Sequence, residues 1–162
     1  MQNAKDTFYL LLRSRLAAVN AERTTVLRGA VRPAVIVLEN ELDAEGSAPH
    51  EAFLLGWTDH ATDLSESLPL DSARCVIRYT TRGTAELSGM DRGRVLDAMD
   101  VELTAMLQPG VAPKQNFTGD SPVTMATAIF WSAPEWSAAV GKDGALTRSA
   151  SVTVFSQREA GE

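Results

Sequence analysis

The chain has 162 residues, 44% of them hydrophobic and 22% charged, which suits one globular domain and excludes disorder throughout. No apolar run approaches the roughly 20 residues that a membrane-spanning helix needs. The net charge of −6 disfavours sequence-specific nucleic-acid binding, and the single cysteine excludes an internal disulfide.

We therefore predict a single domain over residues 1–162, with frayed ends at 1–3 and 157–162. The first residues lack the basic cap and uninterrupted apolar segment of a signal peptide. A reducing cytoplasm is the compartment that best fits a chain with one cysteine.

Charge is segregated along the chain. Residues 1–32 hold six basic and two acidic side chains, whereas residues 33–73 hold nine acidic side chains and no basic one. An acidic surface repels the phosphate backbone of nucleic acids. The acidic span is either a solvated loop or a functional surface, and composition leaves both open.

The first predicted element is an amphipathic helix from about Ala4 to Asn20. Its apolar residues recur at helical spacing: Phe8, Leu11, Leu12, Leu16 and Val19. Arg32-Pro33 predicts an extended turn, since proline restricts the residue before it. Strands are predicted where β-branched and apolar residues gather, at 24–28, 34–38, 52–57 and 75–81, with polar connections at 40–50 and 60–72.

A second helix is predicted between Ser88 and Gln108-Pro109-Gly110. Ser88 is its expected cap, and Asp91 in the first turn favours the helix dipole. One apolar stripe runs along it: Leu96, Met99, Leu103, Met106 and Leu107.

After a predicted loop at 110–122, strands at 124–131 and 146–156 form a long C-terminal β-hairpin. Lys142-Asp143-Gly144 is a turn signal, and the tip at 132–146 is expected to project. The fold class is α+β, a mostly antiparallel sheet packed with two helices.

Few residues are suited to catalysis. Asp59, His60 and Asp63 form a D-H-x-x-D grouping, which is either a polar strand end or the divalent-ion site of a small metal-dependent or ligand-binding enzyme. Cys75 begins an apolar strand, where cysteine behaves as a small hydrophobe. We expect no cofactor, no catalytic constellation and no enzymatic activity.

Arginines and tryptophans are the candidate contact residues. Arg92 and Arg94 near a helix start would clasp an anion, pair with acids of the same helix, or contact a neighbouring subunit. Trp131 and Trp136 flank Pro134, and they are either local core or interface anchors.

The order of elements resembles that of the tail-terminator (minor tail) proteins of long-tailed bacteriophages. The leading helix at 4–16, the strand Cys75-Val76-Ile77-Arg78-Tyr79 and the helix that follows it at 92–107 are the parts of this sequence that carry the resemblance. The resemblance implies a virion structural protein, assembled in the host cytoplasm, that forms a hexameric ring. Such a ring would end the tail tube and join it to the head-side connector.

On this basis we expect a homo-oligomer with a tail tube protein and a head-side connector protein as partners. We expect no membrane contact, and DNA would pass through the ring without sequence-specific binding. A ring needs two different patches that meet, and the basic residues 1–32 and acidic residues 39–71 are a charge-complementary pair. The expected interface residues are Arg13, Arg15, Glu39, Glu41, Asp43, Arg92, Arg94, Trp131 and Trp136.

Overall fold

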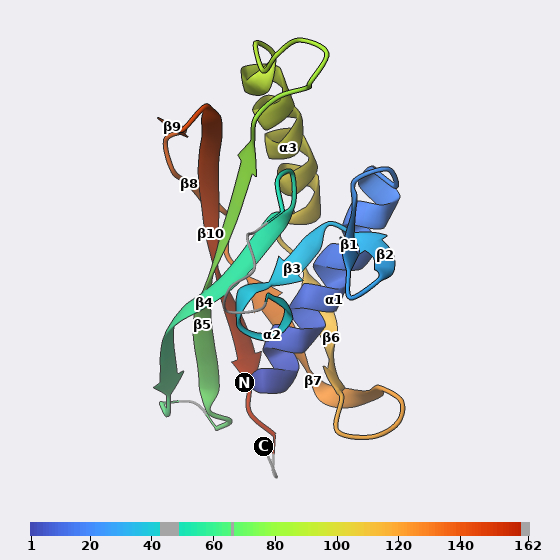
Figure 1. Cartoon of the computed structure of the whole chain (residues 1–162). Coiled ribbons are helices and arrows are strands. Elements are labelled where there is room, and N and C mark those ends of the chain that lie inside the picture. The colour runs from blue at the N-terminus through green and yellow to red at the C-terminus, as the bar shows by residue number, and fades with distance from the viewer. Residues whose placement is uncertain (43–48, 66, 160–162) are drawn as a thin grey trace.

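The computed structural model describes residues 1–42, 49–65 and 67–159. It has the expected α+β fold, in which α1 (Gln2–Val19), the one-turn α2 (Leu38–Glu41) and α3 (Arg92–Met106) accompany a mostly antiparallel sheet (Figure 1). The strands are β1 (Thr24–Leu27), β2 (Ala30–Pro33), β3 (Val35–Val37), β4 (Phe53–Asp63), β5 (Leu70–Thr81), β6 (Val111–Asn116), β7 (Val123–Trp131), β8 (Glu135–Trp136), β9 (Val140–Lys142) and β10 (Ala145–Gln157).

The main sheet is built around β5 and β10, which pair in antiparallel register from Leu146 opposite Thr81 to Gln157 opposite Leu70. On one side, β4 pairs with β5, and β3 joins β4 in parallel. On the other side, β7 and then β6 follow β10, while β8 and β9 pair with the rest of β10. β1 and β2 form a separate two-stranded hairpin.

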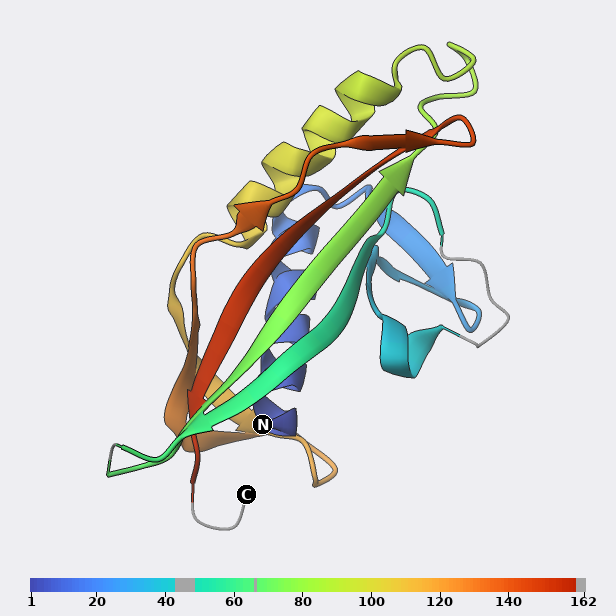
Figure 2. The same ribbon diagram turned by 90° about the vertical axis from the view of Figure 1, so that its left-hand side faces the viewer.

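The core lies between one face of this sheet and the two long helices. Successive side chains of a strand point to opposite faces, so alternate residues of β5 and β10 face α1 and α3 and are buried. In Figure 2, β4, β5 and β10 lie in front of α1 and α3, and neither long helix covers the near face. We call this near face the open face. The buried strand residues toward the helices include Cys75, Ile77, Tyr79, Ala150, Val152 and Val154.

Both predicted helices are confirmed. Phe8, Leu12 and Leu16 of α1 are fully buried, whereas Val19 at its exposed end is 45% accessible. The apolar stripe of α3 is buried along its length, and the helix ends at Met106, before Pro109. α1 begins at Gln2, so residues 2 and 3 belong to the helix and not to a frayed end.

The start of α3 differs from the prediction. Ser88 does not cap the helix, because it lies in the preceding loop with a φ of 51°. Asp91 is the N-cap residue, and its carboxylate accepts hydrogen bonds from the backbone N–H and the hydroxyl of Thr84, each at 2.8 Å. These bonds join the loop to the helix start and lower the pKa of Asp91.

The predicted acidic connection at 60–72 is wrong in its extent. β4 continues to Asp63 and β5 begins at Leu70, so much of this span is paired strand. The strand continues past a bulge at Asp59, whose φ is 46°, because β5 pairs with it as far as Asp63. Polar residues therefore extend a strand that apolar residues begin.

The predicted loop at 110–122 contains β6. Its sequence, with Pro113 and Lys114, lacks the β-branched pattern of a strand. The strand is stabilised by distant contacts instead. The buried Lys114 donates through Nζ to the Gln157 carbonyl at 2.7 Å, and the Gln115 N–H donates to the Thr7 hydroxyl at 3.0 Å.

The turn predicted at Arg32-Pro33 is the end of β2. The actual turn is at Arg28-Gly29, whose φ angles of 50° and 79° match the tight hairpin turn in which both central residues have positive φ. Arginine is not a typical first residue of that turn, so the local pattern contains no strong signal for it. Leu38, predicted as the end of a strand, begins α2.

The C-terminal hairpin is confirmed, since Trp131 pairs with Val154 and the turn at Asp143-Gly144 closes β9 on β10. Its tip does not project freely, because β8 and β9 lie along β10. Part of the C-terminal segment that was predicted to fray is also bound to the rest of the chain. Arg158 binds the Asp71 carboxylate, and Glu159 accepts a hydrogen bond from the Thr127 N–H at 2.7 Å.

Within the described ranges, none of the helices is both long and apolar enough to cross a membrane.

Candidate functional site

The two oppositely charged stretches of the sequence meet within one copy of the chain. Arg32 lies 2.6 Å from the Glu41 carboxylate, and Arg23 lies 3.7 Å from that of Glu51. The ammonium group of Met1 lies 4.0 Å from Asp71. At these positions the expected pairing between copies is replaced by pairing inside the fold, so segregation of charge along the chain is not by itself an argument for docking.

Glu41 and Arg13, both predicted at an interface, belong to one such internal cluster. Glu41 also accepts hydrogen bonds from the Tyr9 hydroxyl and the Val37 N–H, both at 2.8 Å. Burial raises the pKa of Glu41, but its hydrogen bonds outweigh this effect and hold the pKa below its ordinary value. The guanidinium of Arg13 lies over the Tyr9 ring, 5.5 Å from its centroid. These contacts tie α1 to α2.

Arg15 and Trp131 join α1 to the end of α3. Arg15 donates to the Met106 carbonyl at 2.6 Å and lies 5.1 Å from the centroid of the Trp131 ring. Trp131 is 4% exposed, packs edge-to-face on Phe8 and donates its indole N–H to the Leu107 carbonyl at 3.2 Å. The expectation of an interface anchor at Trp131 is therefore corrected, because its ring lies in the core of its own chain.

The remaining predicted contact residues lie nearer the surface. Trp136 on β8 is 40% exposed. Arg92 donates to the Gly144 carbonyl at 3.3 Å, and Arg94 is exposed on α3. Glu39 accepts a hydrogen bond from the Trp57 N–H at 3.3 Å. Asp43 lies outside the described residues.

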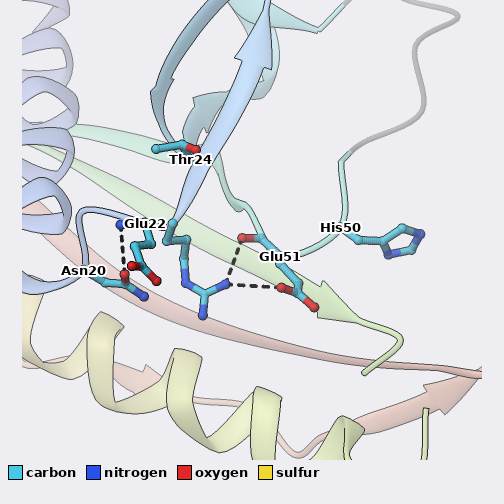
Figure 3. Close-up of a pocket in the computed structure, with 6 residues that line it drawn as sticks. Asn20, Glu22, Thr24, His50 and Glu51 are labelled. Atoms are coloured by element: carbon cyan, nitrogen blue, oxygen red, sulfur yellow. Dashed lines mark hydrogen bonds and ion pairs between the residues drawn. The ribbon is translucent and has the colours of Figure 1, made fainter. Parts of the chain in front are cut away.

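A polar pocket of about 290 Å³ lies where the end of α1 meets the start of β1 (Figure 3). Arg23 lies in its wall with a side chain only 10% exposed. Two carboxylates neutralise it: Arg23 binds both oxygens of Glu102 and also contacts Glu51 through the carboxylate and the backbone carbonyl. Because the charge of Arg23 is already paired, its contacts connect α3 to the segment that leads into β4. The pocket is therefore not an anion site.

Glu102 could have been noticed in the sequence. It follows Met99 by three residues and precedes Met106 by four, so it shares their buried face. A lone carboxylate on an apolar stripe indicates a buried cationic partner elsewhere in the chain. The partner, Arg23, lies 79 residues away and cannot be chosen from the local pattern.

Two further buried groups are structural. Tyr79 and Arg148 both hydrogen-bond to the Asp100 carboxylate, which links β5, β10 and α3. Cys75 is fully buried, and burial raises the pKa of its thiol far above the ordinary value. A neutral thiol in the core matches the expectation of a small hydrophobe and is unsuited to nucleophilic chemistry.

The D-H-x-x-D grouping does not converge. After the bulge at Asp59, His60 pairs with Ala73 on the helix-covered face of the sheet, whereas Asp63 pairs with Leu70 on the open face. Side chains on opposite faces of a strand cannot bind one ion. Consistently, the described part of the chain contains no group of three or more His, Cys, Asp or Glu side chains placed to hold a metal ion.

Large apolar side chains lie outward on two hairpins, and the sequence-based prediction missed both sets. Val26 and Val31 are cross-strand partners on β1 and β2, exposed by 67% and 71%. Leu64 and Leu68, in the connection between β4 and β5, are exposed by 73% and 41%. The sequence does contain a signal for the second set. Leu64 and Leu68 lie in a short connection rich in acidic residues and serine, where leucine is not expected to be buried in its own chain.

A comparison of the chain with protein-family models finds no match, and a comparison with curated proteins finds none either.

Proposed function

We propose that this protein is a structural component of a phage-like tail or neck. It would assemble as a closed ring that ends the tail tube and joins it to a head-side connector. The observation that carries the proposal is that two hairpins each present a pair of exposed apolar side chains: Val26 and Val31 on one, Leu64 and Leu68 on the other. Exposed apolar side chains gathered on projecting elements are typical of surfaces that bind proteins.

The layout of the chain supports the same proposal. A leading amphipathic helix, a long strand followed by a helix, and a closing hairpin are the parts that carry the resemblance to tail-terminator proteins. Several buried or half-buried charged side chains, such as Arg23 and Arg148, already pair within the chain, which favours a structural role over a catalytic one.

Mass measurement in solution and negative-stain imaging test this proposal. The purified full chain should form a discrete ring, with six copies if the resemblance extends to subunit number. Native mass spectrometry should then give one closed assembly and not a continuous ladder of masses. A protein that remains monomeric at high concentration would overturn the ring.

A further inference from the structure

The β4–β5 hairpin ends in an acidic, apolar tip. It extends away from the helices in both ribbon views (Figures 1 and 2). We define the tip by Asp63, Leu64 and Leu68, and the leucines are 73% and 41% exposed. The N–H of Ser65 donates to Asp63 at 2.9 Å and lowers the pKa of that carboxyl, so the tip is negatively charged at neutral pH.

An apolar recess lies on the open face of the same two strands. It has a volume of about 330 Å³, and its lining includes Leu38, Glu39, Leu54, Gly56, Val76 and Arg78. Gly56 creates the hollow, because a Cβ at this position would meet the Leu38 side chain at 3.4 Å. Gly56 pairs with Val76 and Leu54 with Arg78, so all four face the same side.

Arg78 gives this recess a cationic rim. Its side chain is exposed, and no hydrogen bond or ion pair joins it to another residue of the described chain. The acidic residue of the lining, Glu39, accepts a hydrogen bond from the Trp57 N–H, and the preceding arginine of β5, Arg74, pairs with Glu135 at 2.7 Å. Arg78 is therefore available to an acidic partner that also offers apolar side chains.

The tip and the recess match in chemistry but cannot meet within one copy. Val76 and Leu70 are six residues apart on one extended strand, which separates them by about 20 Å at roughly 3.3 Å per residue. β5 is paired with β4 from Leu70 to Arg78, so the strand is extended over this distance. A tip that occupies the recess must therefore belong to another molecule.

We propose that the tip of one copy docks in the recess of the next copy, with Leu64 and Leu68 on its apolar floor and Asp63 beside Arg78. This inference rests on the proposed function, since it supplies the contact from which the ring is built. Tip and recess are different patches, so the interface is heterologous, and such interfaces repeat around an axis to close a ring.

Charge reversal tests the pairing of Asp63 with Arg78. Arg78→Glu and Asp63→Arg should each convert the ring to smaller species in light-scattering and native mass measurements. The double variant should recover the ring mass, because the pair is restored with its signs exchanged. Asp120→Arg is the matched control, because it reverses the charge of an exposed residue in the connection between β6 and β7. It should leave the ring intact. Circular dichroism should give the same fold for all four variants.

Mixing two defective variants tests the direction of the contact. Arg78→Glu disrupts only the recess, and the double change Leu64→Ser with Leu68→Ser disrupts only the tip. Each variant alone should fail to form a ring. Their equimolar mixture should give heterodimers and nothing larger, because one intact tip and one intact recess remain per pair.

The outcomes separate this inference from the proposed function. Variants that keep the wild-type ring mass would overturn the tip-to-recess contact and leave the ring itself standing. Charge reversals that dissociate the ring without rescue in the double variant would overturn the assigned pair. A monomeric wild-type protein would overturn the proposed function and this inference together.

Discussion

Buried ionic groups connect parts of this chain that are far apart in sequence. The Arg23 guanidinium binds Glu102 and Glu51, and Asp100 accepts hydrogen bonds from Tyr79 and Arg148. Removing charged groups from water is costly unless they are paired. Each pair therefore stabilises one arrangement of the helices over the sheet, because other arrangements leave a charge buried alone.

Arg23→Ala should destabilise the fold by about 3–5 kcal/mol, since it leaves the Glu102 carboxylate, in a side chain only 10% exposed, without its cation. Urea unfolding followed by circular dichroism measures the change. Arg94→Ala, at an exposed position of α3, is the control, and a surface substitution of this kind should shift stability by about 0.5 kcal/mol or less. If Arg23→Met with Glu102→Met is no more stable than Arg23→Ala alone, an unpaired carboxylate is not the cause.

Asp71 makes stability depend on pH. Burial raises the pKa of this carboxyl, but hydrogen bonds from Arg158 and Thr62 outweigh burial, so the pKa in the folded chain lies below the ordinary value of 3.8. A lowered folded pKa means that the ionised form favours folding above about pH 4. The contribution is lost as pH falls further through the folded pKa.

Asp71→Asn should therefore lower the free energy of unfolding by about 1–2 kcal/mol at pH 7. The expected loss is this small because Arg158 is partly exposed, and solvent weakens its interaction with Asp71. The difference from wild type should shrink below pH 4, where the wild-type carboxyl is protonated. Thermal unfolding between pH 2.5 and 7 measures both curves. A difference that stays constant over this range would contradict the assigned role of the ionised carboxylate.

At the scale of elements, the two tryptophans near the C-terminal hairpin have different roles. Trp131 ends β7 and packs against α1 and the end of α3, whereas Trp136 on β8 is 40% exposed. They are five residues apart, and the sequence offers the same alternatives for both. Position relative to the helices decides which one is core.

Trp131→Ala should destabilise the fold by about 3–5 kcal/mol, as truncation of a large buried aromatic does. Trp136→Ala should lower the free energy of unfolding by about 1 kcal/mol or less, because part of its ring is already exposed to water. Chemical unfolding of both variants under conditions that keep the protein monomeric provides the comparison. Equal losses of stability would contradict the core position of Trp131.

For the whole molecule, the two faces of the sheet have different roles. α1 and α3 cover one face, and the open face carries the recess with Arg78 at its rim (Figure 2). The projecting tip and the recess lie on the same hairpin, so one structural unit would provide both halves of the contact between copies. Assembly then needs no rearrangement of the core.

Salt should weaken the assembly partially. Raising ionic strength from about 0.1 to 1 M shortens the screening length from about 10 to 3 Å, which weakens an exposed pair such as Asp63 and Arg78. Apolar contact by Leu64 and Leu68 should persist. Sedimentation at both salt concentrations should show a shift toward smaller species in the wild type and a smaller shift in Arg78→Met. Identical shifts would contradict the role of this arginine.

Local pattern was sufficient to predict α3, whose apolar residues recur every three or four positions, and the strand around Ile77, whose residues alternate between two faces. It was not sufficient for β6, because Lys114 and its neighbours form a strand through bonds to distant groups such as the Gln157 carbonyl. The full length of β4 was missed for a related reason. Its polar half is a strand because β5 pairs with it.

The sequence by itself determined the α+β class, the two amphipathic helices and the C-terminal hairpin, since each depends on periodicity and turn chemistry within a short window. Only the tertiary structure decided which charges pair, which tryptophan is buried and which face of the sheet stays open. The charge pattern predicted that the basic stretch with Arg32 and the acidic stretch with Glu41 would pair between two copies. Folding instead brings these two side chains within 2.6 Å of each other in one copy. Such contacts depend on the packing of whole elements, which no local pattern encodes.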